Sequence, residues 1–210
     1  VEALAAGGKA LLVENPLAIT MEDGAAMVAA ASRHGVPLVT GPSHSFDPPV
    51  LAARDLIAEG EIGPPQMALA FNYTDFLYRP RRPEELDTAQ GGGVLFSQAI
   101  HQIDGIRLLM GRPATHVTAR TGAWDADRLT EGAYTALIDF EGGGTASLTY
   151  SGYAHFDSDR WMGDISELGH PKPPDAHTAT RARIAGLSPA AAAALKSGRT
   201  YGADAAPDPA

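Results

Sequence analysis

The sequence predicts an α/β segment followed by an α+β segment. Residues 9–41 contain a short apolar run, a capped helix and a second apolar run, and this β-α-β alternation is typical of a parallel sheet. After about residue 45 the pattern changes to helices and aromatic-rich alternating runs, two of which are joined by a Glu-Gly-Gly-Gly turn. These runs predict a mostly antiparallel sheet.

The first elements follow from local signals. Residues 9–15 form a short apolar run and predict a buried strand. The helix that follows has Thr20 as its N-cap, Asp23 as the capping partner and Gly35 as its stop. Residues 36–41 predict the second strand, parallel to the first.

The second segment opens with a helix whose N-cap is Asp47 and whose first position is Pro48, because a missing N–H costs nothing there. Residues 66–78 alternate and predict a strand, and residues 93–110 predict the longest helix. Beyond these, the sequence predicts strands over 115–124, 133–140 and 145–153, an irregular excursion over 157–187, and a last helix from Ser188 to Gly198.

Composition limits the functions that are open to the chain. It has 210 residues, 44% of them hydrophobic, enough for one large domain or for one domain and part of another. The formal net charge of −9 argues against nucleic acid and against anionic membrane surfaces as partners. Cysteine is absent, which excludes disulfides, thiolate metal sites and cysteine nucleophiles. With neither a membrane-length apolar run nor a signal peptide, we expect a cytoplasmic protein that binds a small molecule.

A polar stripe marks the longest predicted helix. Ser97, His101 and Asp104 are spaced to share one helix face. An imidazole on such a face can act on a bound substrate as a general acid or base. The glycines at 91–93 allow a ligand to approach the backbone. The alternative is a solvated helix face or a hydrogen-bonded core histidine.

Polar residues also follow both parallel strands. Glu14, Asn15 and Pro16 end the first strand, and His44 comes shortly after the second. Ligands of open α/β sheets bind beyond the carboxyl ends of the strands, so these residues are candidates for a binding site. A strand-ending turn is the alternative.

Three arginines stand close together in a chain that is acidic overall. Arg79, Arg81 and Arg82 could hold an anionic substrate, because the guanidinium group binds carboxylates and phosphates in a bidentate manner. The alternative is a solvated loop in which they pair with the acidic residues at 84–87.

Three further side chains lie on or near predicted strands that could face the same cleft: Tyr73, Tyr153 and His155. The histidines have no spacing that suits a metal ion, so we expect no metal site.

The order of these segments resembles one family of enzymes. "GGKALLVENPLAIT", "FDPPVLAARDLIAEGEIG" and "GGGVLFSQAIHQIDGIRLLMG" are similar, in register, to the Gfo/Idh/MocA oxidoreductases, and the resemblance covers residues 3–152. Within that family, "NYTDFLYRPRRPEELDTAQ" and "SLTYSGYAHFDSD" resemble the dihydroxyphthalate dehydrogenase branch.

The resemblance implies a Rossmann-type dinucleotide-binding domain, of which residues 1–45 are the remnant, and an α+β substrate and oligomerisation domain over 46–210. It implies NAD or NADP as cofactor, hydride transfer at a hydroxyl-bearing carbon, and a homo-oligomer that pairs through an open sheet. The chain has no Gly-x-Gly-x-x-Gly fingerprint, opens in mid-pattern at Val1 and ends in the polar tail 200–210. We therefore expect a fragment that is incomplete at both ends.

Site roles also follow from the resemblance. His101 would be the base, Asn15 and Ser97 would position the hydroxyl, and Glu14, Asn15, Pro16 and His44 would contact the cofactor. A carboxylated ring would be held by the arginines, with Tyr73, Asp104, Tyr153 and His155 completing the substrate site. Two departures from the family pattern stand out: Asn15 replaces the usual lysine, and Ser97 replaces a common aspartate.

These departures leave two other functions open. One is a lyase or glycosidase that uses transient oxidation by a tightly held NAD. The other is a non-catalytic cofactor-binding relative, because an asparagine at position 15 cannot supply the positive charge of a lysine.

Overall fold

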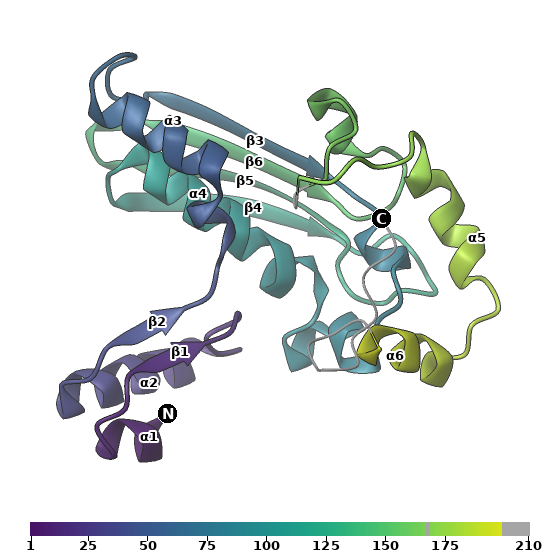
Figure 1. The fold of residues 1–210 in the computed structure, drawn as a ribbon, viewed down its shortest axis with the longest axis horizontal. Helices are drawn as coiled ribbons and strands as arrows, with labels where there is room; N and C mark the ends of the chain where they lie inside the picture. The colour runs from purple at the N-terminus through teal and green to yellow at the C-terminus, as the bar shows by residue number, and fades with distance from the viewer. Residues whose placement is uncertain (167–168, 199–210) are drawn as a thin grey trace.

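The computed structural model describes residues 1–166 and 169–198, which form two separate sheets with their helices (Figure 1). The two-stranded sheet lies at the N-terminal end of the described chain, and the four-stranded sheet is built from later residues. The polar tail predicted over 200–210 lies outside the described residues.

The small sheet and its helices are α1 (Glu2–Ala6), β1 (Leu11–Val13), α2 (Met21–His34) and β2 (Leu38–Thr40). β1 and β2 pair in parallel, as the alternation predicted. The Thr20 hydroxyl accepts a hydrogen bond of 3.0 Å from the backbone N–H of Asp23, and Gly35 ends α2 at a φ of 64°. The β-α-β unit and both helix boundaries are therefore confirmed.

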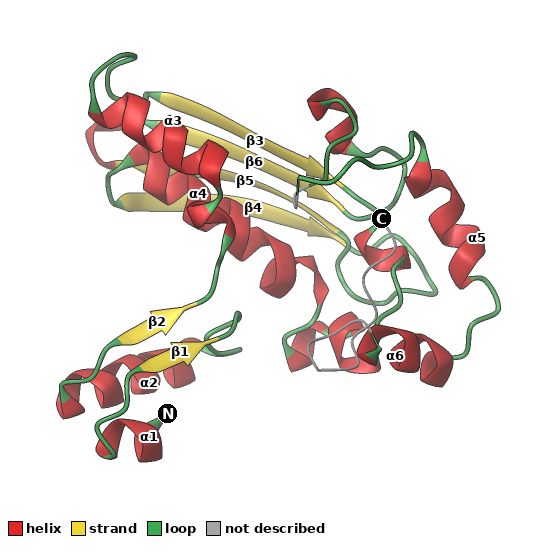
Figure 2. Cartoon of the chain, in the orientation of Figure 1, coloured by secondary structure: helices red, strands yellow, loops and turns green. Residues whose placement is uncertain are grey.

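The larger part contains α3 (Pro48–Ala58), β3 (Met67–Tyr73), α4 (Ile100–Met110), β4 (Ala114–Gly122), β5 (Ala133–Phe140), β6 (Thr145–Ser151), α5 (Thr180–Ile184) and α6 (Pro189–Ser197). Its strand order is β3-β6-β5-β4. β5 pairs antiparallel with both of its neighbours, whereas β3 is parallel to β6. The predicted β5–β6 hairpin is confirmed, and α3 and α4 lie over one face of the sheet (Figure 2).

The core lies between that face and the helices. Alternate residues of β6 are buried, among them Leu148 and Tyr150, and they pack with Ile138 of β5 and with Ile106 and Met110 of α4. Burying one large apolar side chain contributes about 1.5–3 kcal/mol, so this layer stabilises the orientation of α4 on the sheet.

The opposite face of the sheet is exposed. Leu69 of β3 and Leu137 of β5 are each aligned with Ser147 of β6, so the three form one row across the sheet. Leu69 is 59% exposed, Leu137 is 50% exposed, and Phe71 two residues along β3 is 48% exposed. The sheet therefore has one covered face and one open face, as expected.

Short turns complete the described chain: η1 (His44–Phe46), η2 (Phe76–Tyr78), η3 (Pro83–Leu86), η4 (Thr88–Gln90), η5 (Leu95–Ala99), η6 (Glu141–Gly143), η7 (Ser158–Met162) and η8 (Ala176–Ala179). The stretch 157–187, expected to be irregular, contains the short helix α5. Another difference from the expected elements concerns residues 76–78. They are not strand: they form the buried 3₁₀ turn η2, because the chain leaves the sheet after Tyr73 and turns inward. A further difference concerns the predicted helix 93–110, which contains the π-helical turn η5 before α4.

Candidate active site

Asn15 and Gly41 follow β1 and β2 at the same edge of the small sheet. The backbone N–H of Gly41 donates to the Val13 carbonyl at 3.0 Å, and the Asn15 side-chain amide donates to the Gly41 carbonyl at 3.2 Å. A carbonyl oxygen only accepts hydrogen bonds, so the nitrogen end of the Asn15 amide must face it. The two strand ends thus fix the orientation of the Asn15 side chain.

The same amide nitrogen contacts His101, which lies in the first turn of α4. Nδ2 of Asn15 is 3.2 Å from Nε2 of His101. Because Asn15 must donate there, Nε2 presents its lone pair and Nδ1 carries the proton in the neutral ring, an assignment made from the hydrogen-bond network. His101 therefore keeps a basic nitrogen at the carboxyl edge of the small sheet.

His44 joins this pair from η1. Its ring centroid lies 4.5 Å from that of His101, with the planes 60° apart. Nδ1 of His44 lies 2.8 Å from the Asp47 carboxylate. The structure thus brings together Asn15, His44 and His101, which come from three separate elements. Glu14 is exposed and Pro16 is half-buried beside them.

Ser97 and Asp104 flank His101 along the chain, and both are half-buried. Ser97 lies within the π-helical turn, whose i→i+5 bonds change the angular step between residues. The predicted spacing assumed an α-helix throughout, and a shared face for Ser97 and His101 stays a prediction. Asp104 remains on the regular part of α4.

The three glycines before η5 are surrounded by protein rather than by an open space. A Cβ on Gly92 would lie 2.4 Å from the Glu84 carbonyl oxygen, and one on Gly93 would lie 2.1 Å from the Glu131 carboxylate. A Cβ on Gly91 would lie 2.4 Å from the Ile19 side chain. The glycine run was expected to make room for a ligand. Instead, it packs closely against other parts of the chain.

Sequence reasoning missed Glu131. Its carboxylate is buried and accepts hydrogen bonds of 3.1 Å from both the Leu95 backbone N–H and the Thr130 hydroxyl, and the Thr88 hydroxyl also donates to it. A carboxylate at a helix N-terminus is favourable, so Glu131 anchors the start of the helix that carries His101. No local pattern in the sequence marks this role.

The three arginines are paired within the protein. Arg79 donates to Asp75 at 2.6 Å, and Arg82 lies 3.3 Å from Glu85. Arg81 is largely buried, lies 3.8 Å above the Phe76 ring and is 3.3 Å from Glu85. Burial and the neighbouring Arg79 lower the pKa of Arg81, yet an arginine remains charged in a protein. Substrate binding by this loop stays a prediction.

The aromatic candidates occupy other places. Tyr73 packs edge-on against Phe156 and Trp161. Tyr153 is buried, and its hydroxyl donates to the Gly122 carbonyl at 3.0 Å. Together with His155, Tyr153 borders a cavity of about 380 Å³ whose other lining residues are Tyr78, Trp124, Asp125, Ala126, Ser151 and Arg181. In that lining, burial and the hydrogen bond to Asp125 raise the pKa of Tyr78 to about 12.

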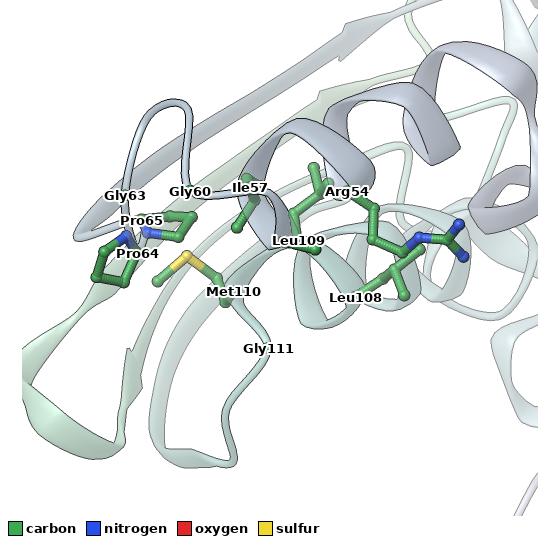
Figure 3. Close-up of a pocket in the computed structure, with 11 residues that line it drawn as sticks. Arg54, Ile57, Gly60, Gly63, Pro64, Pro65, Leu108, Leu109, Met110 and Gly111 are labelled. Atoms are coloured by element: carbon green, nitrogen blue, oxygen red, sulfur yellow. The ribbon is translucent and has the colours of Figure 1, made fainter.

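A second cavity, of about 400 Å³, lies between the ends of α3 and α4 (Figure 3). Leu108, Leu109 and Met110 line it from α4 and Ile57 lines it from α3. Leu108 is seven residues beyond His101, a separation of roughly 10 Å along the helix axis. This apolar cavity is therefore distinct from the His101 site.

A model described as the GFO/IDH/MocA C-terminal domain matches residues 50–163, which include α4 and the whole four-stranded sheet. The chain belongs to the GFO/IDH/MocA family. The resemblance seen in the sequence is thus confirmed for the family.

Relatives within the family support the same placement. The chain is 50% identical over 196 residues to 1-carboxy-3-chloro-3,4-dihydroxycyclohexa-1,5-diene dehydrogenase of Comamonas testosteroni, a match that covers 93% of this chain and 49% of the relative. A crystal structure from Bordetella bronchiseptica RB50 matches with a TM-score of 0.89 and 42% identity, over 94% of this chain and 51% of that one. GenD2 from gentamicin A biosynthesis, solved in complex with NAD, matches with a TM-score of 0.64 and 27% identity, over 72% of this chain and 43% of that one. The chain spans about half the length of these relatives.

Within residues 1–166 and 169–198, no helix is both long and apolar enough to cross a membrane. The same residues contain no group of three or more His, Cys, Asp or Glu side chains that could hold a metal ion.

Proposed function

We propose that the protein containing this chain is an NAD(P)-dependent oxidoreductase that oxidises a hydroxyl-bearing carbon of a cyclic, carboxylated substrate. The observation that carries the proposal is the contact of 3.2 Å between Asn15 Nδ2 and His101 Nε2 at the carboxyl edge of the small parallel sheet. A basic nitrogen at that edge lies where open α/β sheets bind their ligands. The Comamonas testosteroni dehydrogenase is named for a carboxylated dihydroxycyclohexadiene, which supports this substrate class.

The groups at this edge fit the nicotinamide end of a dinucleotide. The Asn15 amide, the Gly41 carbonyl and the His44 ring offer hydrogen-bonding groups and a flat surface. A nicotinamide ring with its carboxamide is likewise flat and hydrogen-bonding. Glu14, Asn15, Pro16 and His44 would hold it there. The bound cofactor supplies the hydride acceptor of the reaction.

His101 carries the proton chemistry in this proposal. Its Nε2 accepts the proton of the substrate hydroxyl, and the Asn15 amide, which occupies Nε2 in the structure, then donates to the substrate oxygen instead. Ser97 and Asp104 lie on either side of His101 along the helix and orient the ring-borne hydroxyls. The Arg79–Arg82 loop and the Tyr153–His155 segment hold the carboxylated end.

The organisation of the chain follows the same proposal. Residues 1–45 belong to a dinucleotide-binding domain of the Rossmann type, and residues 46–210 form the substrate and oligomerisation domain. The open row of Leu69, Ser147 and Leu137 suits pairing with a second copy of the chain, because exposed apolar patches commonly mark protein interfaces. We place the protein in the cytoplasm.

A second candidate is a non-catalytic cofactor-binding relative. It is favoured by Asn15, which holds Nε2 of His101 with a neutral amide where the family usually has a lysine. If this candidate is correct, the natural-length protein binds NAD(P)⁺ without turnover, and Asn15→Lys gains activity.

The test uses the natural-length protein that contains these residues, a panel of carboxylated cyclohexadiene cis-diols, and NAD⁺ or NADP⁺. We expect reduced nicotinamide to form, and His101→Gln to lower kcat by about 10²–10⁴-fold, the usual range for loss of a general base. Full activity in His101→Gln would remove the assigned base. Cofactor binding by wild type with no turnover of any diol would favour the second candidate.

A further inference from the structure

His44 and Asp47 form a unit that supports His101 from a different element. The two imidazole rings are in contact, with centroids 4.5 Å apart, and Asp47 holds Nδ1 of His44 at 2.8 Å. We propose that His44 is a positioning residue for His101 and that the Asp47 carboxylate fixes His44 in that role. The inference rests on the proposed function, in which His101 is the base.

The local backbone explains why Asp47 is available for this contact. Asp47 was expected to cap α3, and it does occupy the N-cap position with an extended backbone, but its side chain makes no cap hydrogen bond. Pro48 and Pro49 remove the first two N–H groups of the helix, and the next, that of Val50, already donates to the Asp47 backbone carbonyl at 2.9 Å. The carboxylate therefore turns to His44, about a turn back along the chain.

The contact adds a carboxylate to the surroundings of His101 besides Asp104, which lies three residues on in α4. A histidine base becomes positively charged when it takes the substrate proton, and a nearby carboxylate stabilises that charge and holds the ring. Ser97, one turn before His101, carries no charge. Asp47 places its negative charge on His44, whose ring contacts the His101 ring, while Asn15 contacts Nε2 of His101.

The solvent exposure of His44 and Asp47 sets how strongly they support His101. The side chains of His44 and Asp47 are 32% and 39% exposed, so solvent screens the carboxylate and the support is moderate. We expect His44→Phe, which keeps a flat ring, and Asp47→Asn, which keeps the shape but not the charge, each to lower kcat by about 10-fold, within the range for coupled residues in contact. The KM for the diol should stay within about twofold of wild type in both variants, and the Kd for the cofactor should do so in Asp47→Asn, which leaves every proposed cofactor-binding group in place.

The double variant tests whether Asp47 acts through His44. If it does, His44→Phe/Asp47→Asn has the kcat of His44→Phe alone, whereas two independent roles would multiply the losses. His34→Phe is the matched control, since Nε2 of His34, at the end of α2, makes a comparable contact of 3.0 Å with Glu2 of α1. Its kcat should equal that of wild type.

The outcomes separate this inference from the function it rests on. Loss of activity in His101→Gln together with wild-type kcat in both His44→Phe and Asp47→Asn overturns the inference and leaves the proposed function standing. A fall in Tm or a rise in KM that accounts for the loss of activity assigns His44 a purely structural or binding role, which also overturns it. Full activity in His101→Gln overturns both.

Discussion

The Asn15 side-chain amide links Nε2 of His101 to the Gly41 carbonyl, with both contacts at 3.2 Å. Two residues that are 86 positions apart thereby share one hydrogen bond at the edge of the small sheet. The amide is held by the backbone of Gly41, directly after β2, so it is oriented before any substrate arrives. In the proposed function, Asn15 therefore has a positional role that does not depend on charge.

Removing that amide should slow the reaction. We expect Asn15→Ala to lower kcat by about 10²-fold, the lower end of the range for losing an oriented hydrogen-bond donor. The KM should change less, because the amide contacts the substrate oxygen most strongly once the proton has moved. Steady-state kinetics with a carboxylated diol measures both constants. Unchanged kcat would show that Asn15 is a strand-ending residue without a role in the reaction.

Gly93 should be far more sensitive to substitution than another glycine with a similar backbone. Gly93 has a φ of 81° and a Cβ there would lie 2.1 Å from the Glu131 carboxylate, whereas Gly163 has a φ of 72° and open space around it. Gly163→Ala should cost about 1–2 kcal/mol of unfolding free energy from backbone strain alone. Gly93→Ala introduces the same backbone strain and also displaces the buried Glu131. The displacement adds about 1–3 kcal/mol to the loss of unfolding free energy.

Urea unfolding of both variants measures the difference. Equal losses in the two proteins would contradict the close packing of Glu131 against the glycine run. A second readout is the helix signal in circular dichroism, which should fall in Gly93→Ala because Glu131 holds the start of η5.

Asp75 should make stability depend on acid pH. Burial alone would raise the pKa of Asp75, but Arg79 at 2.6 Å and the Thr180 hydroxyl at 2.7 Å outweigh it and hold the pKa below its ordinary value. A carboxyl with a lowered pKa in the folded state contributes stability above its unfolded pKa of about 4, and that stability is lost as pH falls through the folded pKa.

Asp75→Asn should therefore lower the unfolding free energy by about 1–3 kcal/mol near neutral pH, the range for hydrogen bonds to a charged group. The gap between wild type and variant should close as pH falls from about 5 towards 2. Denaturant unfolding at a series of pH values provides the measurement. A gap that is constant with pH would assign the effect to side-chain shape rather than to charge.

The open face of the sheet should mediate self-association. Leu69 and Leu137 flank Ser147 in one exposed row, so Leu69→Glu/Leu137→Glu places two charges in the proposed interface. We expect the wild-type oligomer to dissociate in this variant, because like charges that face each other across a symmetric interface are unfavourable. Analytical ultracentrifugation measures the mass, and Leu129→Glu, at a loop residue that is 84% exposed, is the control. An oligomer that survives in the double variant would place the interface elsewhere.

Local signals in the sequence predicted most of the elements. Thr20 and Gly35 delimited α2, Ser188 capped α6, and alternation located β5 and β6, because capping, left-handed turns and strand periodicity involve residues only a few positions apart. Where packing with residues distant in the sequence opposed the local pattern, the prediction was wrong. Phe76–Tyr78 carry a strand pattern but turn into the core instead.

The candidate site likewise contains residues that the sequence predicted and contacts that it did not. Sequence and family resemblance selected Asn15, His44 and His101 as candidates, but the sequence alone did not establish that the three meet. The role of Glu131 and the contact of Asp47 with His44 were not foreseen, since no spacing rule connects a buried carboxylate to a helix start 36 residues away.

The sequence by itself determined the types of element, their order and the family. Only the tertiary structure decided which side chains meet, because those contacts depend on how the small sheet and α4 are placed relative to each other. That placement results from many weak packing contacts distributed over the chain, and short sequence windows do not contain them. The partners of Arg81 and the orientation of Asn15 are therefore properties of the folded chain.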